Sequence, residues 1–158
     1  MDPTRLSPIA SLQLAVRAAV SAVTALAIAQ SLDLEYPIYA LIAAIVVIDL
    51  SPARTREYSL QRVAGTILGA GFGVALSLSF DVHALTIGIG IGILASMWLC
   101  HPLRLQGAEK VTGYTCAIVM FDHAGAPLAY AGHRLIETLL GVGVSLLASL
   151  VPRLLRER

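Results

Sequence analysis

Two arginines, Arg62 and Arg134, are the residues best placed by type and spacing to do chemistry. Each begins a row of small residues at intervals of four, seven and eleven, which lie on one face of a helix. The two rows are Arg62, Thr66, Gly69 and Gly73, and Arg134, Thr138, Gly141 and Ser145. Small residues let helix backbones approach closely, so this face is predicted to point into a helix bundle. A guanidinium there can bind a carboxylate; a simple anchor near the end of a helix remains the alternative.

Arg17 and three acidic residues form a second group of candidates. Arg17 interrupts a long apolar run and therefore needs a partner or a cavity. Asp49 and Asp122 each close an apolar run, and either is a partner for Arg17, a coupling site, or a polar residue that ends a helix. Glu137 lies one turn from Arg134, so it either neutralises that charge or takes part in proton coupling.

No motif in the chain indicates an enzyme. Neither a Gly-x-Ser-x-Gly nor a His-Glu-x-x-His motif occurs, and no phosphate-binding loop is present. The four histidines lack metal-ligand spacing, and Cys100 and Cys116 lie in or beside apolar runs as small core residues. The sequence therefore predicts no catalysis, no cofactor, no metal and no nucleic-acid partner.

The composition places these residues in a lipid bilayer. Hydrophobic residues make up 57% of the 158 residues and charged residues 13%, unlike an ordinary soluble domain. Apolar runs predict six transmembrane helices in a single transmembrane domain, residues 1–158. The expected spans are Ser11 to Ser31, Tyr36 to Leu50, Ser59 to Ser79, Ala84 to Leu99, Val111 to Phe121, and Tyr130 to Val151.

The chain repeats itself at an offset of 72 residues. Residues 58–71 (YSLQRVAGTILGAG) align with residues 130–143 (YAGHRLIETLLGVG), and 44–49 align with 117–122 after one residue of slippage. Repeat 1 covers about 11–79 and repeat 2 about 84–151, with three spans each. An odd number of spans reverses the second copy, so the prediction is an all-α membrane protein built as two inverted three-helix repeats.

The lysine and arginine residues of the loops and termini lie on one predicted side of the membrane. They occur in the amino-terminal segment, the links 51–58 and 100–110, and the tail, while the three opposite loops carry none. By the positive-inside rule both termini are cytoplasmic. An alternative reading takes Ala27-Ile28-Ala29 as a signal-peptidase site behind the first apolar stretch.

The second span, in repeat 1, and the fifth span, in repeat 2, occupy matching positions, and both are short. Matching short spans in two inverted repeats indicate a substrate site. Lys110, Tyr114 and Thr115 would then face it; the alternative is a helix shortened by burial in an oligomer. The predicted substrate-binding residues are Arg17, Arg62, Thr66, Lys110, Tyr114, Arg134 and Thr138. The predicted coupling residues are Asp49, Asp122 and Glu137.

Three segments carry a family resemblance. The runs 36–47 (YPIYALIAAIVV), 51–55 (SPART) and 60–70 (LQRVAGTILGA) resemble the fusaric acid resistance and aromatic acid exporter (FUSC) superfamily. The resemblance implies a six-helix module of the bacterial inner (plasma) membrane that exports aromatic or other organic carboxylates. It also implies kinship with dimeric plant malate channels, with Arg17, Arg62 and Arg134 lining the anion route. Many such exporters carry two modules and a cytosolic domain, so we expect this shorter chain to act as a homodimer, which leaves exporter-type energy coupling in doubt.

Three functions follow as hypotheses. The first is proton-coupled or passive export of small carboxylates, the second a passive anion channel, and the third a membrane scaffold that transports nothing. Only the export and channel hypotheses require the arginines on the glycine face to bind an anion.

Overall fold

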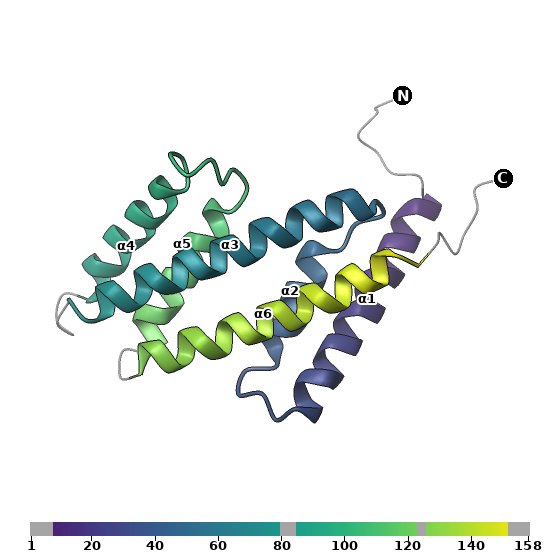
Figure 1. The fold of residues 1–158 in the computed structure, drawn as a ribbon, viewed down its shortest axis with the longest axis horizontal. Coiled ribbons are helices and arrows are strands. Elements are labelled where there is room, and N and C mark those ends of the chain that lie inside the picture. The colour runs from purple at the N-terminus through teal and green to yellow at the C-terminus, as the bar shows by residue number, and fades with distance from the viewer. Residues whose placement is uncertain (1–7, 80–84, 123–125, 152–158) are drawn as a thin grey trace. The chain divides into compact units, whose positions relative to one another are not determined.

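The computed structural model describes residues 8–79, 85–122 and 126–151, and all regular structure in these ranges is helical. The six helices are α1 (Pro8–Ser31), α2 (Ile38–Val47), α3 (Pro52–Ser77), α4 (Leu85–Leu99), α5 (Glu109–Asp122) and α6 (Pro127–Ser149). Figure 1 shows their course along the chain. The predicted all-α fold is confirmed for this part of the chain.

Two of the helices, α1 and α6, are long and apolar enough to cross a membrane. α2 and residues 86–99 of α4 are apolar but shorter. The ten residues of α2 rise about 15 Å at about 1.5 Å per residue, roughly half of a hydrocarbon core about 30 Å thick. Six complete crossings remain a prediction.

Prolines begin two of the helices earlier than the apolar runs suggest. Pro52 and Pro127 are the first residues of α3 and α6. Proline suits this position because the first amides of a helix have no partner inside it and the ring already holds a helical φ. The opening turns of α3 are polar (PARTRE, residues 52–57), so a criterion based on apolar runs starts this helix too late, at Ser59.

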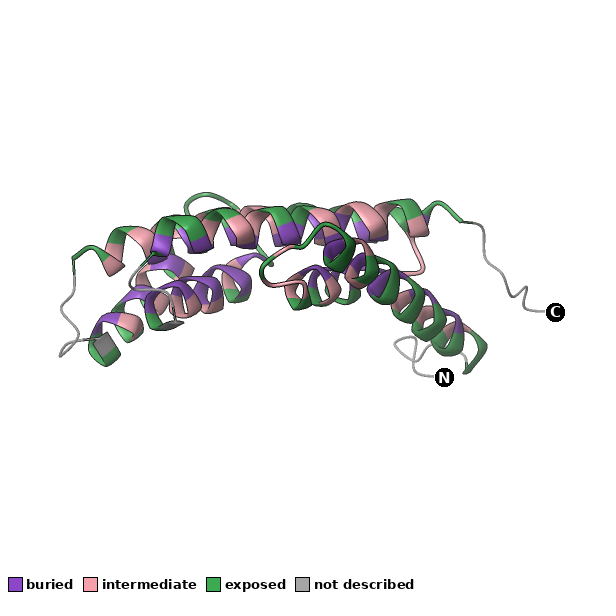
Figure 2. Cartoon of the chain, turned by 90° about the horizontal axis from the view of Figure 1, so that it is seen from below, coloured by how far each residue is buried: buried purple, intermediate pink, exposed green. Residues whose placement is uncertain are grey.

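The chain divides into two compact units. Unit 1 takes its described residues from 1–59 and 137–158, and unit 2 from 60–136. In unit 1, α2 packs on α1 around a core of small residues, namely Ala25, Ala29, Ala40 and Ala44. In unit 2, α4 packs on α5. Figure 2 marks the buried positions along each helix.

In unit 2, glycines bring α3 into close contact with α5. A Cβ added to Gly65 would lie 2.7 Å from the Cβ of Val111, and one added to Gly69 would overlap the carbonyl group of Thr112. Gly73 is equally crowded by α5. Because no larger side chain fits at these positions, the glycine face of α3 is a helix contact surface, as its spacing predicts.

Unit 1 contains a matching contact between α6 and α2. A Cβ added to Gly141 would overlap the carbonyl group of Ala40. Gly141 lies 72 residues after Gly69, and Thr112 lies 72 residues after Ala40. The same close approach therefore occurs in both units at the offset of the sequence repeat.

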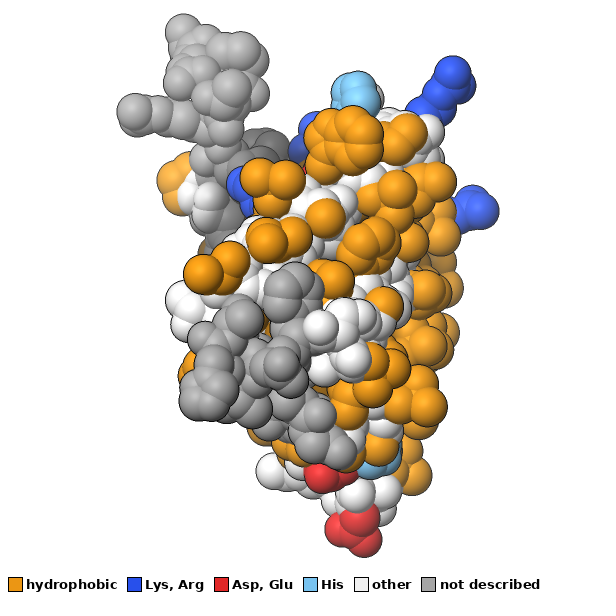
Figure 3. Space-filling view, turned by 90° about the vertical axis from the view of Figure 1, so that its left-hand side faces the viewer, with side chains coloured by type: hydrophobic (Ala, Val, Ile, Leu, Met, Phe, Trp, Pro, Cys, Tyr) orange, Lys and Arg blue, Asp and Glu red, His pale blue; other side chains and the backbone are white. Residues whose placement is uncertain are grey.

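Large hydrophobic side chains cover much of the surface in Figure 3. On α4 the most exposed are Ile87, Ile91, Leu94 and Trp98. Soluble monomers rarely leave such an extended apolar surface facing water. A surface of this kind needs lipid or protein to cover it.

Candidate functional site

Two buried arginines lie against one tyrosine in unit 2. Arg62 on α3 and Arg134 on α6 are each only 2% exposed. The guanidinium carbon (Cζ) of Arg62 lies 5.3 Å from the centre of the Tyr114 ring on α5, and that of Arg134 lies 5.8 Å from it. The negative face of an aromatic ring attracts a cation at such distances. The structure thus brings together three of the residues that the sequence nominates for substrate binding.

The glycine contact between α3 and α5 places Arg62 beside Tyr114. Arg62 precedes Gly65 by one turn, so its side chain leaves α3 on the face that approaches α5. Thr66, also buried on this face, donates its hydroxyl hydrogen to the carbonyl oxygen of Arg62 at 2.9 Å. Since that donor is already used inside α3, Thr66 can offer a ligand only its oxygen lone pairs.

Several polar atoms in this cluster have no hydrogen-bond partner within the described residues. They are Nε and Nη2 of Arg62 and the hydroxyl oxygen of Tyr114; Oγ1 of Thr115, the next residue of α5, whose side chain faces Gly69 of α3, also has none. A buried donor without a partner is costly, especially a charged one, so such a group binds water or a ligand when one is present. The cluster therefore offers unused donors beside two positive charges, which is the chemistry of an anion site.

Three other residues are nominated for substrate binding, namely Arg17, Lys110 and Thr138. Lys110 is exposed in the first turn of α5. Arg17 and Thr138 belong to unit 1, where both are buried. The site that can be described directly therefore consists of Arg62, Tyr114 and Arg134.

Glu137 is fully buried in unit 1 and is bonded to the chain just before α2. Its Oε1 accepts a hydrogen bond of 2.7 Å from the backbone amide of Tyr36. A carboxylate at this position also interacts favourably with the amino-terminal end of the α2 dipole. The helical spacing of Glu137 predicts only Arg134 as its partner. The hydrogen bond to Tyr36, 101 residues away, cannot be predicted from the sequence.

Of the two aspartates nominated for coupling, Asp49 has a local structural role. Its Oδ1 accepts a hydrogen bond from the amide of Ser51, and its own amide donates to Oγ1 of Thr55. These bonds shape the turn that leads into α3. Asp122 is the last residue of α5, and its side chain lies outside the described part of the structure.

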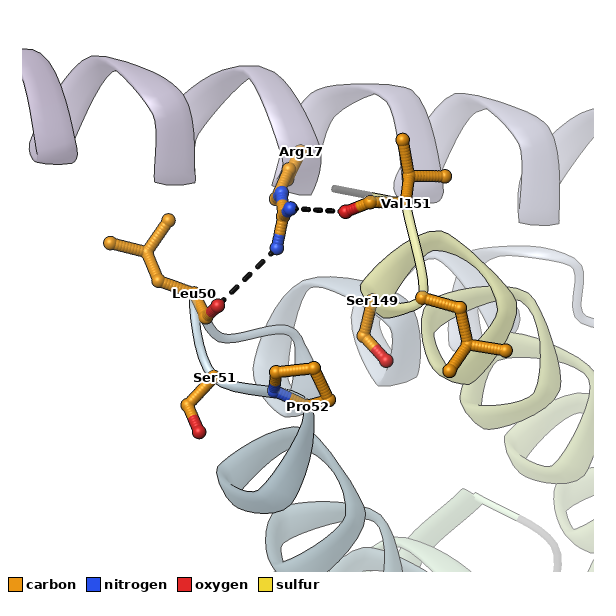
Figure 4. A pocket seen from close by; sticks show the side chains of 7 residues that line it. Arg17, Leu50, Ser51, Pro52, Ser149 and Val151 are labelled. Carbon is orange, nitrogen blue, oxygen red and sulfur yellow. Dashed lines mark hydrogen bonds between the residues drawn. The ribbon is translucent and has the colours of Figure 1, made fainter. Parts of the chain in front are cut away.

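Arg17 is buried in unit 1 and donates to backbone carbonyls (Figure 4). Nη2 donates to the carbonyl oxygen of Val151 at 2.5 Å, and Nη1 lies 3.5 Å from that of Leu50. Arg17 also lines a cavity of about 270 Å³. The sequence predicts both a partner and a cavity as possibilities, and the structure supplies both, although the partners are backbone groups.

A polar stripe on α1 accompanies Arg17. Gln13, Arg17 and Ser21 are spaced four apart and all are buried. Nε2 of Gln13 and Oγ of Ser21 have no hydrogen-bond partner within the described residues. The spacing of four is present in the sequence, but the small apolar residues around these positions make the stripe hard to recognise there.

A comparison with protein families finds that residues 13–151 match the family described as "Aromatic acid exporter family member 1". The match covers nearly the whole chain and confirms the resemblance seen in segments 36–47, 51–55 and 60–70. No curated protein and no solved structure matches the chain.

Proposed function

Because the chain belongs to the aromatic acid exporter family, we propose that it is a membrane protein that exports small organic anions, with aromatic carboxylates as the first candidates. The family is one of transporters rather than enzymes. The substrate class is our inference from the side chains of the site.

The observation that carries the proposal is the buried pair of arginines at Tyr114. Two guanidiniums near one ring repel each other, and burial removes the water that would screen them. An anion between them would offset that repulsion and take up the unused donors of Arg62. A carboxylate suits this arrangement because a guanidinium can bind both of its oxygens.

The site also suits a planar aromatic substrate. Tyr114 and the guanidinium groups offer flat surfaces on which an aromatic ring can stack. The hydroxyls of Tyr114 and Thr115 can bond to a polar substituent on such a ring. A small hydroxylated aromatic acid would use all three kinds of contact.

We propose that transport uses two inverted three-helix repeats with both termini in the cytoplasm. The matching contacts of Gly69 with Thr112 and of Gly141 with Ala40, at one sequence offset, support the repeat. The shortness of α2 and α5 supports a site at the equivalent helices of the two halves. The protein would work as a homodimer in the bacterial inner membrane. The mass of the purified protein in mild detergent tests the dimer.

Buried Glu137 is our candidate for coupling transport to protons. Its carboxylate holds the amide of Tyr36 before α2 and lies on the same helix as Arg134, three residues away. Protonation would weaken the hydrogen bond to Tyr36, since a charged acceptor binds an amide more strongly than a neutral one. Such a step would connect proton binding to the position of α2.

Efflux from proteoliposomes tests the proposal. Vesicles that contain the purified protein are loaded with 4-hydroxybenzoate, and its release is compared with that from protein-free vesicles. Release that depends on the protein and is competed by benzoate supports anion export. Absence of protein-dependent release across a panel of aromatic, aliphatic and inorganic anions would favour the scaffold hypothesis.

The same vesicles separate a carrier from a channel. A proton gradient that drives 4-hydroxybenzoate against its own gradient identifies a coupled carrier. Flux that only follows the electrochemical gradient of the anion, with unitary currents in planar bilayers, identifies a passive channel.

A further inference from the structure

The cavity beside Arg17 lies in unit 1, whereas the site at Tyr114 belongs to unit 2. Its lining consists of Arg17, Leu50, Ser51, Pro52, Ser149, Leu150 and Val151. In Figure 4 the Arg17 guanidinium lies between the carbonyl groups of Leu50 and Val151. These carbonyls engage two of the five N–H donors of the guanidinium. Nε of Arg17, a side chain that is only 6% exposed, has no partner within the described residues.

The amino terminus of α3 borders the same cavity. The hydrogen bond from the amide of Thr55 to the carbonyl oxygen of Ser51 is the first of the helix. Since Pro52 has no amide hydrogen, the amides of Ala53 and Arg54 are left without a partner in the helix. A helix amino terminus favours a bound anion, and a phosphate group is a common occupant of such a place. The helix terminus and the buried Arg17 are two separate observations that indicate the same ligand chemistry.

A second, more apolar cavity of about 360 Å³ adjoins the first. The two share Pro52, Ser149 and Leu150, and the second is lined also by Ala53, Arg56, Leu146 and Leu147. Leu147 and Leu150 are each about 70% exposed, so the apolar lining continues onto the surface. A phosphate site that opens onto a leucine-lined hollow fits an amphiphile better than a free ion.

The charge of this region favours an anion. The charged side chains of α1 and of residues 49–57 are Arg17, Asp49, Arg54, Arg56 and Glu57. The carboxylate of Asp49 accepts a hydrogen bond from the amide of Ser51. Neither Asp49 nor Glu57 is among the described residues that line the two cavities. Arg17 and Arg56 do line them.

We propose that these adjoining cavities bind an anionic phospholipid. Its phosphate lies between the guanidinium group of Arg17 and the first amides of α3, and one acyl chain lies along Leu146, Leu147 and Leu150. Arg56 contacts the outer part of the headgroup. The link before α3 faces the cytoplasm in the predicted topology, and basic pockets on that side of a membrane are suited to such lipids.

The test adds short-chain lipids at increasing concentration to the detergent-solubilised full chain and measures its melting temperature at each concentration. Phosphatidylglycerol is expected to raise the melting temperature, and phosphatidylcholine to have little effect. Arg17→Gln should weaken the response to phosphatidylglycerol about tenfold or more, because a charge-assisted pair of hydrogen bonds is lost. Arg104→Gln, which alters an exposed arginine of unit 2, is the matched control and should respond like the wild type.

Arg17→Lys guards against a variant that simply folds poorly. Lysine keeps the charge and can still donate to the carbonyl of Val151, but it lacks the planar fork, so the protein should fold while its affinity for phosphatidylglycerol falls. An equal response of wild type and both Arg17 variants to phosphatidylglycerol would overturn the proposal. So would stabilisation by inorganic phosphate at the concentrations at which the lipid acts, because the site would then be one for a free anion.

Discussion

The guanidinium of Arg62 lies over the ring of Tyr114, with 5.3 Å between its Cζ and the ring centre, and these residues come from different helices, α3 and α5. Arg134 approaches the same ring from α6. One tyrosine thus holds two buried cations, and Nε and Nη2 of Arg62 have no hydrogen-bond partner within the described residues. The glycine-mediated contact of α3 with α5 positions this arrangement, and the arrangement is the basis of the anion transport that we propose.

Substitutions of Tyr114 separate the role of its ring from that of its hydroxyl. Tyr114→Leu should lower the free energy of unfolding by about 2 kcal/mol, because desolvated cations lose an aromatic partner. Tyr114→Phe keeps the ring and removes a hydroxyl that has no partner in the described structure, so its stability should equal or exceed that of the wild type. Thermal unfolding in detergent measures both; equal destabilisation by the two changes would contradict the ring's role.

Alanine at the contact glycines should be harmful, and alanine at their neighbours harmless. Gly69→Ala and Gly141→Ala force a methyl group into a backbone carbonyl, with an expected loss on the order of 1 to 3 kcal/mol. An added Cβ at Gly71 or Gly143 meets nothing within 4 Å, so alanine there should leave the melting temperature nearly unchanged. Four melting curves decide this, and a harmful Gly71→Ala would show that the two faces of α3 are wrongly assigned.

How far the sequence predicts this molecule depends on the kind of interaction. The spacing of Arg62, Gly69 and Gly141 predicts the contact faces because helical periodicity is local. The start of α3 at Pro52 is missed because its first turns are polar and charged. The bond between Glu137 and Tyr36 and the carbonyl partners of Arg17 depend on the tertiary fold, so a one-dimensional pattern cannot contain them.

Glu137 offers a test of proton coupling. Glu137→Gln keeps an oxygen that can accept from the Tyr36 amide, so the protein should fold and purify normally, whereas Glu137→Ala leaves that amide without its acceptor and should be less stable by about 1 to 3 kcal/mol. If Glu137 carries the coupled proton, transport by Glu137→Gln should no longer depend on pH. A pH dependence of efflux equal to that of the wild type would exclude Glu137 as the coupling group.

Cysteine labelling tests the predicted topology. The native Cys100 and Cys116 are both fully buried, so they should react slowly with a charged maleimide. Arg56→Cys and Arg104→Cys should react from the cytoplasmic side, and Glu35→Cys from the opposite side, because the positive-inside rule orients the loops in this way. Labelling of all three positions from one side would contradict the inverted repeat.

The most direct test of the central claim is the rate of 4-hydroxybenzoate efflux from proteoliposomes, compared between wild type, Arg62→Gln and Arg54→Gln at equal protein content. Arg62→Gln removes a buried cation of the proposed site, and Arg54→Gln removes an exposed one of the same helix. Our account expects Arg62→Gln to reduce the rate about tenfold or more, since a charged donor pair to the anion is lost, while Arg54→Gln retains most of it. An efflux rate of folded Arg62→Gln equal to that of the wild type would contradict anion transport through this site.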